Sequence, residues 1–227
     1  MKQRIVWLDL WRSLAVLVML VFHGLWDLEL FGVLPAGTLE TPLTNAVRYI
    51  FGGSFILISG LLVLRGSAPV RRGFVLLCLG LAVAVVTTLI GLPVQFGILT
   101  LMGLCMLLCG ALREPLLKLR GPWMAAACAL LFVGTWVLTA RVRVEAGWLF
   151  PLGLRRADFF SADYWPVLPW AFLYLLGAAL GGFLPETAKT RGAPKALTFL
   201  GRHSLVIYLV HQPVLYGICR IFLGNKV

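Results

Sequence analysis

The stretch RSLAVLVMLVFHGLWD, residues 12–27, decides the fold, because its middle is apolar enough to lie within a lipid bilayer. A helix needs about twenty mostly apolar residues to cross the hydrocarbon layer, and runs of this kind recur along the chain. Hydrophobic residues make up 60% of the 227 residues and charged residues only 13%, against roughly half and one quarter in soluble domains. We therefore predict an all-α, polytopic membrane helix bundle that forms a single domain over residues 1–227.

We predict about seven spans, each an apolar run of nearly the required length. They cover approximately residues 5–29, 46–64, 73–91, 94–112, 122–140, 164–184 and 202–223. The basic N-terminus followed by an apolar run resembles a signal peptide, but the run is long, Arg12 interrupts it and no small-x-small cleavage site follows. We expect this segment to be retained as the first span.

The basic residues predict the orientation, because Lys and Arg accumulate in cytoplasmic loops. With the N-terminus inside, the cytoplasmic segments carry most of them: Lys2, Arg4, Arg65, Arg71, Arg72, Arg113, Lys118, Arg120, Lys189, Arg191, Lys195 and Arg202. The opposite side carries fewer: Arg48, Arg141, Arg143, Arg155, Arg156, Arg220 and Lys226. This distribution predicts an N-in, C-out multi-pass protein of the cell (inner) membrane.

The formal charge of +11 does not point to nucleic acid, since the basic residues lie in loops between spans rather than in a segment free of them. The five cysteines fall inside apolar runs. Cys105 and Cys109 share a helix face, but the chain has no paired CxxC motif, so we predict packing roles for the cysteines and no metal site. GAALGG, residues 177–182, predicts close helix contact at Gly177 and Gly181.

The ionisable residues of the first span lie along one side of a helix. With about 100° per residue, His23 returns to within about 20° of Arg12 and lies about 16 Å further along the axis. Asp9 and Asp27 lie about 60° to one side. Asp9–Arg12 and His23–Asp27 are spaced three and four residues apart, within side-chain reach. We call Asp9, Arg12, His23 and Asp27 the polar stripe.

A charged group in hydrocarbon is costly, so the polar stripe must face protein or water. For Arg12 the simpler alternative is that it extends to the inner surface, or pairs with Asp9 to hold helices together. For His23 we expect Asp27 to orient the imidazole, the arrangement that a general base needs.

Four stretches carry a resemblance to a known family: LDLWRSLAVLVMLVFHGLWDL (8–28), FILISGLLV (55–63), DYWPVLPWAFLYLLGAALG (163–181) and LGRHSLVIYLVHQPVL (200–215). Arg12 and His23, separated by ten residues in a first span, resemble the motif of integral-membrane acyltransferases. More specifically, the four stretches are similar to bacterial proteins related to the heparan-alpha-glucosaminide N-acetyltransferase catalytic domain.

The resemblance implies transfer of an acyl group, an acetyl group above all, from cytoplasmic acyl-CoA (acetyl-CoA) as co-substrate to a glycan or other envelope acceptor. It implies that His23 is the catalytic base and Arg12 a donor-binding or transition-state group. The sequence departs from related bacterial proteins at FGILT (96–100), where Thr100 replaces a histidine, and the loop 31–44 contains no histidine. The identity of the acceptor is therefore not carried over.

The last span supplies further candidates for substrate binding. Ser204, Tyr208 and His211 follow at spacings of four and three, on one face, and Pro213 would kink the helix beside them. His211 would then face the polar stripe, or instead form an interhelical hydrogen bond that holds the kink. Gln95, near the start of the fourth predicted span, is a further candidate for hydrogen bonding to another helix or to substrate.

Two other functions compete with acyl transfer. The polar stripe would also suit a membrane transporter or proton relay, although no inverted repeat or pair of broken helices is evident. It would equally suit a non-catalytic assembly protein in which the stripe only holds helices together. The lipid bilayer is a predicted partner in each case, and the sequence leaves open whether the chain forms a homo-oligomer.

Overall fold

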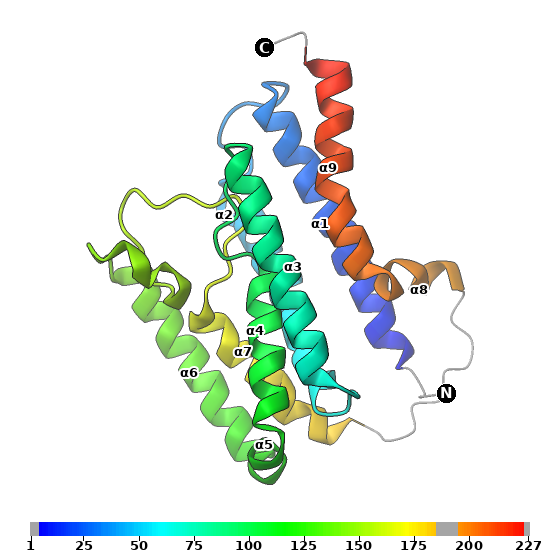
Figure 1. Ribbon diagram of the computed structural model, residues 1–227, viewed down its shortest axis with the longest axis vertical. Coiled ribbons are helices and arrows are strands. Elements are labelled where there is room, and N and C mark those ends of the chain that lie inside the picture. Colours follow the sequence, from blue (N-terminus) through cyan, green and yellow to red (C-terminus); the bar gives the residue numbers. More distant parts are fainter. Residues whose placement is uncertain (1–4, 185–194, 225–227) are drawn as a thin grey trace. The chain divides into compact units, whose positions relative to one another are not determined.

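The computed structural model describes residues 5–184 and 195–224, and every regular element in these ranges is helical (Figure 1). The elements are α1 (Val6–Leu30), α2 (Pro42–Val63), α3 (Pro69–Leu89), α4 (Ile98–Ala111), α5 (Arg113–Leu119), α6 (Pro122–Arg141), η1 (Gly147–Leu152), α7 (Val167–Leu180), η2 (Gly181–Phe183), α8 (Lys195–Arg202) and α9 (Ser204–Leu223). Of the charges behind the predicted orientation, Lys2, Arg4, Lys189, Arg191, Lys226 and the side chain of Lys195 lie outside the described residues.

Within the described ranges, five helices are long and apolar enough to cross a membrane: α1, α2, α3, α6 and α9. The pair α4 and α5 passes the same test together, although it bends by 83° at the break. The chain is therefore an all-helical, multi-pass membrane protein, as the sequence predicts. Which face is cytoplasmic remains a prediction.

The fourth predicted span, 94–112, is shorter than expected for reasons visible at both ends. Before α4 the chain is extended, because the Trp165 amide donates to the Phe96 carbonyl over 2.8 Å and the Ala162 amide to the Pro93 carbonyl over 2.9 Å. At the other end, Pro115 cannot donate to the carbonyl of Ala111, the last residue of α4. The chain bends there and continues as α5.

The sixth predicted span, 164–184, is also shorter in the structure. Leu168 has extended backbone angles (φ −98°, ψ 128°), the conformation that a following proline favours, and Pro169 follows it. The segment Val167–Phe183 is therefore a shorter apolar helix than α1 or α2.

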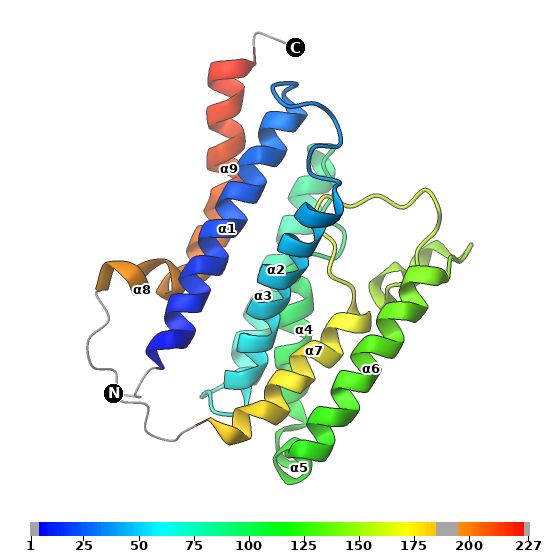
Figure 2. The ribbon, with the colours of Figure 1, turned by 180° about the vertical axis from the view of Figure 1, so that it is seen from behind.

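The chain divides into two compact units, and the boundary falls inside α2. Unit 1 comprises residues 1–55 and 185–227, and unit 2 comprises residues 56–184. In unit 1, α1 packs against α8 and α9 (Figures 1 and 2). In unit 2, α3 packs along α4 and α6 along α7. That all 227 residues form one domain remains a prediction.

Close helix contacts in unit 2 depend on small residues, as the sequence predicts for Gly177 and Gly181. A Cβ atom at Gly177 would lie 2.2 Å from the Leu57 carbonyl oxygen of α2, and one at Gly181 would lie 2.4 Å from the Leu61 carbonyl oxygen. Gly60 meets the Tyr174 carbonyl in the same way. The backbones of α2 and α7 therefore touch, which only glycine permits.

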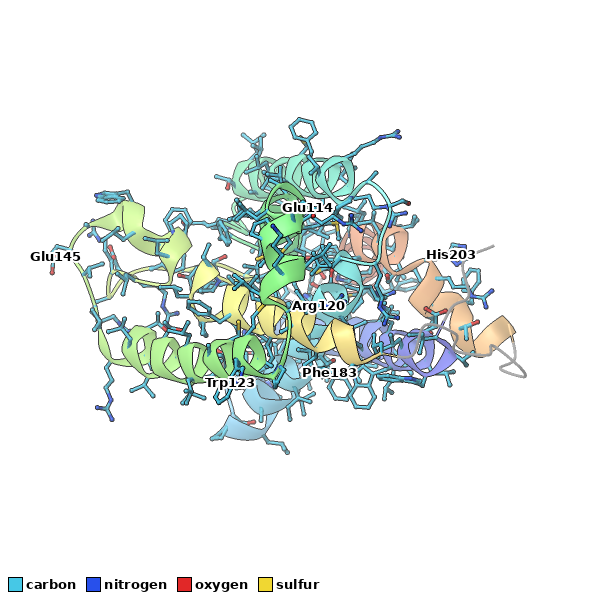
Figure 3. The ribbon with its side chains drawn as sticks, turned by 90° about the horizontal axis from the view of Figure 1, so that it is seen from below. Glu114, Arg120, Trp123, Glu145, Phe183 and His203 are labelled. Atoms are coloured by element: carbon cyan, nitrogen blue, oxygen red, sulfur yellow. The ribbon has the colours of Figure 1, made fainter. Side chains whose placement is uncertain are left out.

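The end of unit 2 where α4 bends is basic. Figure 3 shows α5 lying across this end, with Glu114 and Arg120 labelled and Trp123 at the start of α6. Arg113 donates to the Leu64 carbonyl over 3.2 Å, and Arg65 donates to the carbonyls of Gly181 and Leu184. These arginines satisfy carbonyl groups at the ends of helices, which lack partners within their own helix.

Candidate functional site

The polar stripe lies on one unbroken helix. Because α1 is continuous from Val6 to Leu30, the angles worked out from the sequence hold along its length. Asp9 and Asp27 are buried, whereas the opposite side of α1 exposes large apolar side chains: Trp7, Leu14, Leu17, Val21 and Leu25. The stripe therefore faces protein, and the apolar side is available for lipid.

His23 is oriented by its own helix. Its Nδ1 lies 2.9 Å from the carbonyl oxygen of Met19. Because a carbonyl oxygen only accepts hydrogen bonds, Nδ1 must carry a proton and donate it. In the neutral ring Nε2 is then unprotonated, so it is the nitrogen that can accept a proton from a substrate.

Asp27 has a different partner from the one that the sequence predicts. No hydrogen bond joins it to His23 in the part of the chain that the structure describes. Its Oδ1 instead accepts a hydrogen bond from the Nε2 of Gln212 on α9, over 2.8 Å. The expectation that Asp27 orients His23 by a direct bond is therefore wrong in this geometry, because the Met19 carbonyl already occupies Nδ1.

His211 is brought against His23, as one reading of its spacing predicts. The two rings meet edge to face, with centroids 4.7 Å apart and planes at 79°. The Nδ1 of His211 donates to the Tyr208 carbonyl over 2.6 Å, and the Tyr208 ring lies 5.4 Å from the His211 ring. Ser204, half-buried, is the first residue of α9, which continues through Pro213 as a single helix.

The sequence analysis did not single out Gln212. The available signal was its polarity within an apolar span, next to His211 and Pro213. Intramembrane amides are costly unless they are hydrogen-bonded, so such a residue calls for a partner on a neighbouring helix. The four side chains His23, Asp27, His211 and Gln212 form what we call the α1–α9 cluster.

The other end of the stripe contacts α8. The Ser13 hydroxyl donates to the Asp9 carbonyl over 2.9 Å and accepts from the Gly201 amide over 2.8 Å. A Cβ atom at Gly201 would lie 3.2 Å from the Cβ of Arg12. The paired contacts 13–201, 23–211 and 27–212 increase together, so α1 and α9 run in the same direction, as the predicted topology requires.

The third histidine, His203, lies outside this cluster. It precedes α9, is exposed, and its Nδ1 donates to the Phe199 carbonyl over 3.0 Å (labelled in Figure 3). The chain contains three histidines in all. Two of them therefore meet in the cluster, and the third supplies a natural control.

Gln95 lies in unit 2, in the segment before α4. Its amide nitrogen lies 3.4 Å from the Phe160 carbonyl, to which it donates, so its role in substrate binding remains a prediction. Thr100 is buried, and its hydroxyl has no hydrogen-bond partner among the described residues. A Cβ atom at Gly80 would lie 2.6 Å from that hydroxyl, so Thr100 is in close contact with α3.

The segment before α7 has structural roles. Asp163 accepts hydrogen bonds from the Ile98 amide at the start of α4 and from the Trp165 indole, over 3.2 and 2.5 Å. Arg156 and Asp158 form an exposed ion pair over 3.0 Å. The Tyr164 hydroxyl donates to the Phe150 carbonyl over 2.6 Å. Burial raises the pKa of Tyr164 to about 12, opposed in part by the Arg155 guanidinium.

The fold and the cluster together define a class of protein: a multi-pass helical membrane protein whose first and last described spans bring two histidines and a carboxylate together. The chain belongs to the family described as heparan-alpha-glucosaminide N-acetyltransferase, catalytic, whose model matches residues 4–213. Comparisons with curated proteins and with solved structures give no match. The chain is thus a member of a membrane acetyltransferase family, which uses acetyl-CoA.

Proposed function

We propose that this protein transfers an acetyl group from cytoplasmic acetyl-CoA to a hydroxyl or amine of a glycan or other envelope acceptor, in the inner membrane, with His23 as the general base. The observation that carries the proposal is the hydrogen bond from His23 Nδ1 to the Met19 carbonyl, which leaves Nε2 as the proton acceptor. Family membership supplies the reaction class.

The step begins when Nε2 of His23 takes the proton of the acceptor group. The acceptor oxygen or nitrogen attacks the thioester carbonyl carbon, the bond from this carbon to sulfur breaks, and CoA leaves as a thiolate that takes up the proton. The Met19 carbonyl stabilises the imidazolium that forms in between, because it accepts a hydrogen bond from the charged ring. General-base catalysis of this kind contributes about 10²–10⁴-fold to a rate.

Arg12 has the complementary role at the other end of α1. It lies about 16 Å from His23 along the helix axis, comparable with an extended pantetheine arm. In the predicted orientation Arg12 is nearer the cytoplasmic face, and basic loops on that face would attract the polyanionic nucleotide of CoA. Arg12 would then hold the donor while its thioester reaches His23.

The test is acetyl transfer by purified protein from radiolabelled acetyl-CoA to a panel of sugars. His23→Ala should lower kcat by about 10²–10⁴-fold, and His203→Ala is the matched histidine control that should keep wild-type kcat. Undiminished transfer by His23→Ala would refute the assignment of the base. Proton flux in liposomes without binding of acetyl-CoA would favour the relay function instead.

A further inference from the structure

The α1–α9 cluster contains three buried polar atoms that have no hydrogen-bond partner among the described residues: Asp27 Oδ2, Gln212 Oε1 and His211 Nε2. The Asp27 side chain is fully buried and His211 is 8% exposed. Buried polar atoms are nearly always satisfied, by protein, by water or by a ligand. These three atoms therefore indicate an occupant.

Each of the three atoms is an acceptor. Gln212 turns its NH₂ group toward Asp27 Oδ1, which leaves Oε1 as an acceptor. His211 donates through Nδ1 to the Tyr208 carbonyl, so Nε2 of the neutral ring carries a lone pair. The second carboxylate oxygen of Asp27 also accepts. The occupant must therefore donate hydrogen bonds and has no need to accept any.

Charge narrows the choice further. Asp27 is a buried carboxylate whose hydrogen bond comes from a neutral amide, and a buried charge is stabilised chiefly by an opposite charge. A primary ammonium group carries a positive charge, three N–H donors and no lone pair. Water would satisfy the acceptors but would leave the charge uncompensated.

We propose that Asp27, Gln212 and His211 bind a primary ammonium group of the acyl acceptor, and that a hydroxyl next to this ammonium is the group that is acetylated. The inference rests on the proposed function. An ammonium held in this site is protonated and has no lone pair, so it anchors the substrate and cannot attack the thioester. A neighbouring hydroxyl reaches His23, because the His23 ring lies 4.7 Å from that of His211.

The atoms of the step balance as in the general scheme. The hydroxyl proton passes to His23 Nε2, the oxygen forms a bond to the acetyl carbon, the carbon–sulfur bond breaks, and CoA leaves as a thiol after taking the proton. The product is an amino ester. Its ammonium nitrogen carries the same protons before and after the transfer.

The binding test uses purified protein and three matched probes: trans-2-aminocyclohexanol, trans-1,2-cyclohexanediol and cyclohexylamine. By titration calorimetry, the amino alcohol should bind at least about tenfold more tightly than the diol, as expected for a hydrogen bond to a charged group. Asp27→Asn should abolish this preference, and so should Gln212→Met if Asp27→Asn does not fold. Thr135→Val in α6, far in sequence from the cluster, is the control that should retain it. Equal binding of diol and amino alcohol to wild-type protein, as expected for a site filled only by water, would overturn the proposal.

The product test uses radiolabelled acetyl-CoA and the amino alcohol at neutral pH. The labelled product should be an ester, which hydroxylamine cleaves, and cyclohexylamine should not be acetylated. An amide product would overturn the anchoring role of the amine while leaving the acetyltransferase function intact. A binding preference without transfer to any probe would support the ammonium site and refute the proposed function.

Discussion

Gly201→Ala tests the contact between α8 and α1 beside Arg12. A Cβ atom at this position would lie 2.4 Å from the Asp9 carbonyl oxygen and 3.0 Å from the Ser13 hydroxyl, whereas ordinary contact begins at 3.4 Å. The helices must therefore separate by about 1 Å, since a backbone carbonyl cannot rotate away. Overpacking of this kind costs about 1–3 kcal/mol, offset by up to about 1 kcal/mol for alanine in a helix.

The expected net loss is about 1–2 kcal/mol, which corresponds to a fall in Tm of about 2–8 °C for a chain of this size. Thermal unfolding in detergent measures it, with Gly217→Ala as the matched control, because a Cβ at Gly217 meets nothing within 4 Å. If Arg12 holds the donor, Gly201→Ala should also raise the KM for acetyl-CoA more than it lowers kcat. A variant as stable as wild type would refute the close contact of α8 with α1.

Two further predictions concern unit 2. Gly177→Ala should lower Tm by several degrees, because its Cβ would lie 2.2 Å from the Leu57 carbonyl oxygen, whereas Gly134→Ala, with nothing within 4 Å, should not; equal Tm values for the two variants would contradict the backbone contact of α2 with α7. Asp163→Ala should destabilise the protein by about 0.5–2 kcal/mol, because the Ile98 amide at the start of α4 loses its acceptor. Denaturant unfolding with Asp158→Ala as the exposed control measures this loss, and equal midpoints would refute the capping role.

The elements that depend on one helix alone could be predicted from the sequence. The first span, predicted at 5–29, is the helix Val6–Leu30, because apolar length and the spacing of polar residues are properties of a single segment. The segments before α4 and α7 could not be predicted, since their conformation depends on hydrogen bonds between positions more than sixty residues apart, such as Phe96 with Trp165. Spacing predicted that His23 and Asp27 lie near each other, but not that Gln212 would take the Asp27 carboxylate.

The orientation of His23 by a carbonyl separates two roles that a catalytic triad combines. In a triad, a buried carboxylate fixes the tautomer of the histidine and carries a full negative charge. The Met19 carbonyl fixes the tautomer of His23 without that charge, which suits a membrane-spanning segment where ionised groups are costly. Asp27 is then available to bind an ammonium group. Asp27→Asn should therefore raise the KM for an amine-bearing acceptor more than it lowers kcat, whereas His23→Ala should lower kcat, because the first change removes an anchor and the second removes the base.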